Sequence, residues 1–183
     1  SGFDMNKITL KSMKPAVRTP ALFEGKIHFF SGTRGSSCPR MTILAKRNGR
    51  KASHLYFKDM GLESYGHMLQ VHRDRIKSHP KQVQSVVSGT FDAFAWSIKN
   101  IDGAFDVYIK ANPNKDKEIT RVQLQEMIVD VQDPSVISKG LGYMKESMVR
   151  KSVATANKYF KLSPQVDYKK VYTNKFIRPN PGL

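Results

Sequence analysis

The sequence is poor in cysteine, in acidic residues and in long apolar runs. Its single cysteine, Cys38, excludes an internal disulfide framework and any zinc site built on cysteines. The five histidines follow no metal-ligand spacing such as HExxH, so we expect neither a metal ion nor another cofactor. No stretch is long and apolar enough to span a bilayer, and we therefore expect no transmembrane association.

The acids are too few to balance the cations, and this excess indicates the class of partner. Over 183 residues, 31 Lys and Arg face 15 Asp and Glu, which leaves a net charge of +16. Residues 1–60 carry 12 cations and 3 acids, and residues 135–183 carry 10 and 2, whereas the middle is close to neutral. Such a charge is costly to assemble unless a polyanion is the usual partner. Nucleic acid is the first candidate and an anionic membrane surface is the second.

The stretch 41–58 has the pattern of a hairpin with a basic tip. Apolar and polar residues alternate on both sides of Asn48-Gly49, a dipeptide typical of tight type I′ turns. Lys46, Arg47, Arg50 and Lys51 surround that turn. Cations at such a tip either protect a strand end from aggregation or form a finger that grips nucleic acid, and the composition of the chain favours the finger.

Strand and helix patterns alternate along the rest of the chain. We expect strands at 24–30, at 91–110 around an Asn100–Gly103 turn, and at 120–131, where the alternation slips. Apolar stripes at spacings of three and four predict helices over 59–79 and 136–160. The predicted fold is therefore α+β, with two halves that each hold a strand meander and a helix, and with antiparallel sheets packed against the helices.

Three stretches resemble the Whirly superfamily of single-strand-binding proteins, which includes single-strand-binding transcriptional coactivators and kinetoplastid guide-RNA-binding proteins. They are "FEGK" at 23–26, "ASHLYFKDMGLESYGHML" at 52–69 and "AWSIKNIDGAFDVYIK" at 95–110. Glu24 stands where that group has the first lysine of a Lys-Gly-Lys motif. The resemblance implies a Whirly-like domain at 23–162, between a basic arm at 1–22 and a basic, aromatic tail at 163–183.

Binding to single strands with little sequence preference requires cations for phosphates and aromatic rings for unpaired bases. If Leu55 and Phe57 are buried, the alternation leaves His54 and Tyr56 on the open face. In the same way, burial of Phe105, Val107 and Ile109 would leave Tyr108 and Lys110 on the open face. Trp96 shares its face with Phe94 and Ile98, so we expect it in the core. The full set of candidate binding residues is Lys26, Arg34, Arg40, Lys46, Arg47, Arg50, Lys51, His54, Tyr56, Tyr108 and Lys110.

Other functions fit the sequence less well. The acids near turns, such as Asp102 and Asp116, form no nuclease motif, so we do not expect an enzyme. A viral or organellar protein that coats RNA and a matrix-type protein at a membrane surface remain alternatives, and we expect an intracellular location. The helical stripes and the tail, which has no core of its own, predict a homo-oligomer, specifically a tetramer.

Overall fold

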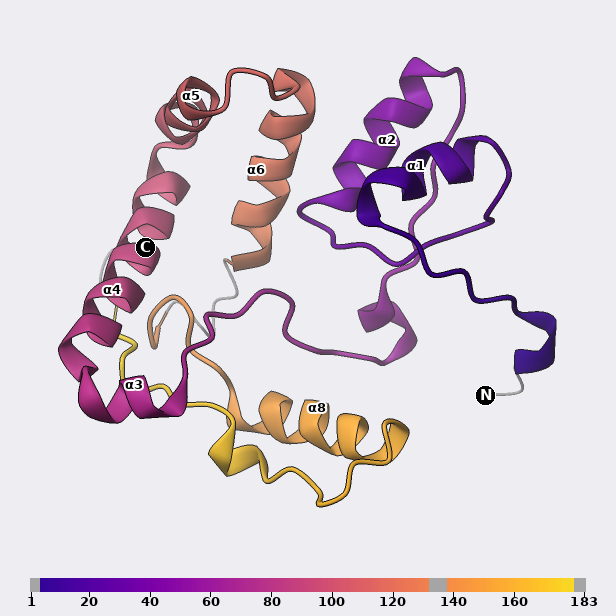
Figure 1. Cartoon of the computed structure of the whole chain (residues 1–183). Coiled ribbons are helices and arrows are strands. Elements are labelled where there is room, and N and C mark those ends of the chain that lie inside the picture. The colour runs from indigo at the N-terminus through magenta and orange to yellow at the C-terminus, as the bar shows by residue number, and fades with distance from the viewer. Residues whose placement is uncertain (1–3, 132–137, 180–183) are drawn as a thin grey trace. The chain divides into compact units, whose positions relative to one another are not determined.

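The computed structural model describes residues 4–131 and 138–179. Contacts divide the chain into two compact units, Ser1–Gly32 and Thr33–Leu183. None of the described residues lies in a strand, and the regular elements are all helical (Figure 1). The predicted α+β fold with antiparallel sheets is therefore wrong.

The first unit holds the short 3₁₀ helix η1 (Met5–Lys7) and the helix α1 (Pro15–Phe23). Pro15 stands in the first turn, where proline costs no hydrogen bond. After α1 the amides of Lys26 and Ile27 both bind the carbonyl of Ala21, and Gly25 takes a φ of +71°. The beginning of the predicted strand 24–30 is thus the end of a helix, and no part of it pairs as a strand.

The predicted first arm of the hairpin is the helix α2 (Ser37–Arg47) of the second unit. Its buried residues are Pro39, Met41, Ile43 and Ala45, which stand two apart in the sequence. On a helix, positions 39 and 43 form one stripe and positions 41 and 45 form another on nearly the opposite side. A helix that is buried on two sides therefore has the same alternation as a strand.

The Asn48-Gly49 pair ends α2 and does not form a hairpin turn. The Asn48 side chain donates to the carbonyl of Leu44 at 2.7 Å, and Gly49 takes a φ of +65°. The positive φ that suits a type I′ turn also suits the residue that follows a helix, so the same dipeptide fits both structures.

The helix predicted over 59–79 is largely absent. The 3₁₀ helix η2 (Phe57–Met60) is followed by irregular chain, and α3 (Arg73–Ser78) is only a short helix near the end of the predicted span. Gly61 ends η2 with a φ of +81°, and Gly66 lies within the irregular stretch. Two glycines weaken the helix that the apolar stripe alone predicts.

Three helices replace the second set of predicted strands. They are α4 (Pro80–Lys99), α5 (Ile101–Ala111) and α6 (Lys117–Val131), which contact one another, and α2 packs against α6 (Figure 1). Asn100, predicted to begin a turn, separates α4 from α5, and its side chain donates to the carbonyl of Trp96 at 2.9 Å. The apolar positions of α4 recur at spacings of three and four, a helical period: Val83, Val87, Phe91, Phe94 and Ile98.

The last helix is shorter than the predicted span 136–160, of which residues 136 and 137 lie outside the described residues. Helix α8 (Glu146–Tyr159) begins only after Gly140 and Gly142, which take φ values of +108° and +84°. An added Cβ on Gly140 would collide with the Arg178 backbone, and one on Gly142 would collide with the Phe91 ring. These two glycines thus let the turn before α8 approach both α4 and the tail.

The tail lies against α4 of its own unit (Figure 1). Phe176 is buried, and its carbonyl accepts a hydrogen bond from Gln84 Nε2 at 2.9 Å. Arg178 pairs with Asp92 at 3.1 Å, and the 3₁₀ helix η3 (Tyr168–Lys170) contacts α8. The order of the tail therefore needs no second subunit, and the predicted tetramer stays a prediction.

Candidate nucleic-acid interface

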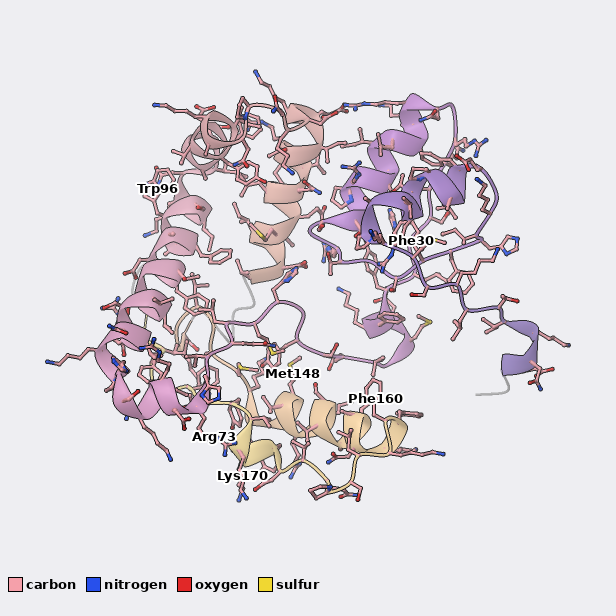
Figure 2. The ribbon with its side chains drawn as sticks, in the orientation of Figure 1. Phe30, Arg73, Trp96, Met148, Phe160 and Lys170 are labelled. Carbon is pink, nitrogen blue, oxygen red and sulfur yellow. The ribbon has the colours of Figure 1, made fainter. Side chains whose placement is uncertain are left out.

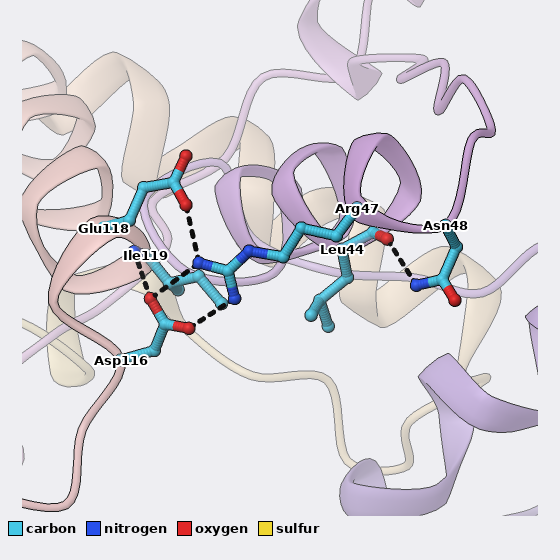
Figure 3. A network of polar contacts seen from close by, with 6 residues as sticks. All are labelled: Leu44, Arg47, Asn48, Asp116, Glu118 and Ile119. Carbon is cyan, nitrogen blue, oxygen red and sulfur yellow. Dashed lines mark hydrogen bonds and ion pairs between the residues drawn. The ribbon is translucent and has the colours of Figure 1, made fainter.

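Arg47, predicted to bind nucleic acid, holds α2 to the start of α6 (Figure 3). Its guanidinium donates to Asp116 Oδ2 at 2.5 Å and to Glu118 Oε2 at 2.6 Å. Asp116 Oδ1 also accepts from the amide of Ile119 at 3.0 Å, as an N-cap does. The Arg47 hydrogen bond lowers the pKa of Asp116 to about 2, and both carboxylates raise the pKa of Arg47. This arginine has a structural role.

Arg34 makes a second link to α6. Its Nε donates to Glu126 Oε2 at 2.8 Å, and its Nη1 lies 3.4 Å from Asp130 Oδ1. The hydrogen bond that Arg34 donates to Glu126 raises the pKa of Arg34. The same guanidinium lies 5.9 Å from the ring centre of Tyr56, which is half-buried. Arg34 and Tyr56 are therefore engaged within the protein in this structure.

Ion pairs in the second unit favour arginine over lysine. Besides Arg34 and Arg47, Arg121 binds Asp102 at 2.6 Å and lies over the Phe105 ring, and Arg178 binds Asp92. The fork of a guanidinium can bridge two carboxylates, whereas lysine is a single flexible charge. The arginines thus take up acids from α4, α5 and α6, and many lysines face solvent without a carboxylate.

The other predicted binding residues are spread over separate elements. Arg40, Lys46, Arg50 and Lys51 are exposed on α2 or just after it. Tyr108, which is 46% exposed, and Lys110 lie on α5, and Lys26 of the first unit pairs with Glu24 at 2.5 Å. The structure therefore groups the cations at the end of α2 but shows no single face with the whole predicted set.

The faces assigned around residue 55 are inverted. Leu55 is 86% exposed and Phe57 is 57% exposed, whereas His54 and Tyr56 are half-buried. His54 Nε2 lies 2.9 Å from Thr42 Oγ1, which ties this segment to α2. The predicted core position of Trp96 is also wrong, because that side chain is 47% exposed at the end of α4 (Figure 2).

A basic face on α8 was not among the predicted sites. Arg150, Lys151 and Lys158 are exposed on this helix, whose one acid, Glu146, accepts a hydrogen bond from Tyr168. Tyr159 and Phe160, 71% and 76% exposed, follow at the C-terminal end of the helix (Figure 2). We call these five residues, from Arg150 to Phe160, the α8 face. The run Lys158-Tyr159-Phe160-Lys161 is visible in the sequence and could have revealed it.

The described residues give no sign of a metal site. Among them, no three His, Cys, Asp or Glu side chains lie close enough together to hold a metal ion. Burial raises the pKa of the Cys38 thiol, which disfavours the nucleophilic thiolate. No helix in the described part of the chain is both long and apolar enough to cross a membrane.

No protein-family model, curated protein or solved structure matches this chain. The resemblance to the Whirly group gains no support from a relative, and the sheets that it implied are contradicted by the helical fold.

Proposed function

We propose that this protein binds single-stranded nucleic acid, with the α8 face as its principal contact and the cations at the end of α2 as a second one. The observation that carries the proposal is the α8 face. It combines three cations with two largely exposed aromatic rings. The one carboxylate of helix α8, that of Glu146, already accepts a hydrogen bond from Tyr168.

The two kinds of side chain suit two parts of an unpaired strand. Cations attract phosphates with little regard to sequence, and the release of counterions makes this attraction depend on salt. Exposed rings stack on unpaired bases, which contributes about 1–3 kcal/mol per base. A duplex hides its base faces, so the rings of Tyr159 and Phe160 favour a single strand.

The decisive experiment is competition binding with single-stranded RNA, single-stranded DNA, duplex DNA and anionic phospholipid vesicles at two salt concentrations. We expect both single strands to compete more strongly than the duplex or the vesicles. Tighter binding to duplex would overturn the preference for single strands, and tighter binding to vesicles would favour a membrane-surface protein instead.

Removing the cations tests the α8 face directly. The triple variant Arg150→Ala, Lys151→Ala, Lys158→Ala should reduce the steepness of log K against log salt by about 2, because each phosphate contact on a single strand contributes about 0.7. The control Lys81→Ala, Lys115→Ala, Lys117→Ala removes the same charge from exposed positions at the start of α4 and around the start of α6. An equal change in both variants would mean that only net charge matters.

Removing the rings tests stacking. Tyr159→Ala and Phe160→Ala should each weaken single-strand binding by roughly 5- to 150-fold, the equivalent of about 1–3 kcal/mol. Tyr159→Phe keeps the ring and should bind almost as the wild type does. If Tyr159→Phe is as weak as Tyr159→Ala, the hydroxyl matters and stacking is not the cause.

The oligomer remains part of the proposal. The tail docks within its own unit, which removes one of the two reasons for expecting a tetramer, but the exposed apolar residues still favour association. Light scattering on the protein free of nucleic acid measures its mass, and a monomer at micromolar concentration would contradict the oligomer.

A cleft supports a second candidate function, the binding of a small aromatic anion. It has a volume of about 410 Å³, Phe91 and Phe176 line it, and Lys99 and the Asp92–Arg178 pair contribute charges. That volume is in the range of small-molecule sites. Anilinonaphthalene sulfonate should fluoresce in the wild type and much less in Ala95→Trp, which fills the cleft. Equal fluorescence in Ala95→Trp and in the surface control Ala154→Trp would exclude this site.

A further inference from the structure

The segment 51–56 has an extended backbone, and within the described chain only the Tyr56 carbonyl of this backbone has a hydrogen-bonding partner, the amide of Asp59. After α2 the chain runs irregularly until η2, and Tyr56 has the strand-like angles φ −89° and ψ 129°. Within the described chain, the amides and carbonyls of residues 51–55 form no hydrogen bond. Such a row of unpaired backbone groups can pair with another strand.

One side of this segment is held in place by the domain. His54 is bound to Thr42, and the Tyr56 ring lies 6.4 Å from the His54 ring and under the guanidinium of Arg34. Ala52, His54 and Tyr56 are half-buried, whereas Lys51, Ser53 and Leu55 are exposed. This alternation is that of a strand with one face on a protein, so the segment is fixed before any partner arrives.

We propose that residues 51–56, an irregular extended segment in the free protein, bind an acidic, extended peptide segment of another protein by forming a two-stranded β-pair with it. In this mode the backbone hydrogen bonds supply affinity and alternate side chains supply specificity. The partner's apolar side chains would cover Leu55 and Phe57, which are otherwise largely in water. Binding would thus satisfy the unpaired backbone and the exposed apolar surface together.

The charges around the segment select the occupant. Lys46, Arg50, Lys51 and Lys58 are all exposed beside it. Asp59 follows Lys58, and the carboxylates of Glu126 and Asp130, which lie near Tyr56, are bound by Arg34. A second copy of the chain would place the same cations opposite one another, on a protein whose net charge is +16. A peptide with carboxylates between its apolar residues meets attraction at those positions, so it is favoured over a second copy.

The test uses the full chain without nucleic acid and a labelled peptide of about eight residues, in which Val alternates with Glu and Thr. Eight residues of a strand span about 27 Å, which covers the roughly 20 Å of residues 51–56. Fluorescence anisotropy measures binding, and amide hydrogen exchange shows where it occurs. We expect exchange to slow about tenfold at alternate amides within 51–56, and the same peptide with Lys in place of Glu to bind at least tenfold more weakly.

Proline substitutions test the backbone pairing. Neighbouring residues of a strand direct their amides to opposite edges, so Ala52→Pro and Ser53→Pro each block one edge. We expect one of the two to abolish peptide binding, whereas Ser53→Ala keeps it. Neither proline removes a hydrogen bond of the free protein, so the melting temperature should stay within a few degrees of the wild type.

Three results would overturn the proposal. The first is full peptide binding by both proline variants, and the second is equal binding of the acidic and the basic peptide. The third is a dimeric wild type that becomes monomeric in Ser53→Pro, because a second copy of the chain would then be the occupant of the segment. Single-strand binding by the α8 face should be unchanged in Ser53→Pro, so a failure here is distinct from a failure of the proposed function.

Discussion

The α2–α6 contact and the α8–tail region use their charges in different ways. Between α2 and α6, Arg34 and Arg47 bind four carboxylates of α6 and the loop before it. In the α8–tail region the fixed contacts are mostly neutral: the amides of Asn157 and Asn174 bind backbone groups, and Gly140 and Gly142 permit close approach.

This difference separates cations that hold the fold from cations that are available to a partner. A guanidinium between two carboxylates is neutralised within the protein, and a polyanion would have to compete with those carboxylates for it. The lysines of α8 have no such competitor in their own helix, because Glu146 is bound to Tyr168. The charge of the α8 face can therefore be changed with little effect on the fold, and the charge of Arg47 cannot.

The largest effect should come from the glycines of the α8–tail region. Gly142→Ala places a Cβ against the Phe91 ring at a φ of +84°, and it should lower the free energy of unfolding by about 2–4 kcal/mol. The control Gly89→Ala lies within α4 with open space around it, and it should raise that free energy by about 0.5–1 kcal/mol. Urea denaturation measures both variants.

An equal, small effect of both glycine variants would show that Phe91 moves aside readily. The close packing of the turn against α4 would then contribute little to stability, and the α8–tail region would be held by its hydrogen bonds, the Arg178–Asp92 pair and the burial of Phe176.

A smaller effect is expected at the α2–α6 contact, and it should depend on pH. The folded-state pKa of Asp116 is about 2, below its ordinary value of 3.8. The ionised carboxylate therefore stabilises the folded state fully above pH 3.8, and this stabilisation is lost as the pH falls toward 2. Arg47→Ala should lower the melting temperature by a few degrees at pH 7 and by less at pH 2. Thermal melts across this range provide the measurement.

The matching control at the α2–α6 contact is Lys46→Ala, which removes a neighbouring exposed charge that has no carboxylate partner. If Lys46→Ala and Arg47→Ala shift the melting temperature equally at pH 7, the bridge to Asp116 and Glu118 contributes nothing beyond general charge.

The smallest effect should be that of a single cation on α8. Lys151→Ala removes no ion pair and should change the free energy of unfolding by no more than about 0.5 kcal/mol. The same variant should measurably weaken single-strand binding at low salt. A clear loss of stability in urea would place Lys151 among the residues that hold the fold.

Two apolar stripes predicted helices over 59–79 and 136–160, and the first of these is largely absent from the structure. Helix α8 lies within the span predicted for it, although the chain before it turns at two glycines. Helix α2 was missed because Met41, Ile43 and Ala45 are buried on two sides, and two-sided burial has the period of a strand. For α4 the alternation of Phe94, Trp96 and Ile98 concealed a longer helical stripe.

The sequence also shows which residues are charged but not which of them are paired. Arg47 and Asp116 are 69 positions apart, and no local pattern indicates that they meet. The composition indicated a polyanion as the partner, and that partner stays a prediction. The selection of Arg34 and Arg47 as binding residues did not anticipate the carboxylates that they bind in the folded protein.

The two asparagines of the α8–tail region have a further consequence, which concerns chemical ageing. Asn174 accepts from the Met144 amide and donates to the Met144 carbonyl, both at 2.9 Å, and Asn157 forms the same pair of bonds with Val166. Each carboxamide thus takes the place of a peptide group. Hydrolysis of either carboxamide to a carboxylate would keep the oxygen that accepts from the backbone amide but would remove the NH₂ group that donates to the carbonyl. It would also place a negative charge next to that carbonyl oxygen. Spontaneous deamidation would therefore loosen the tail without cutting the chain.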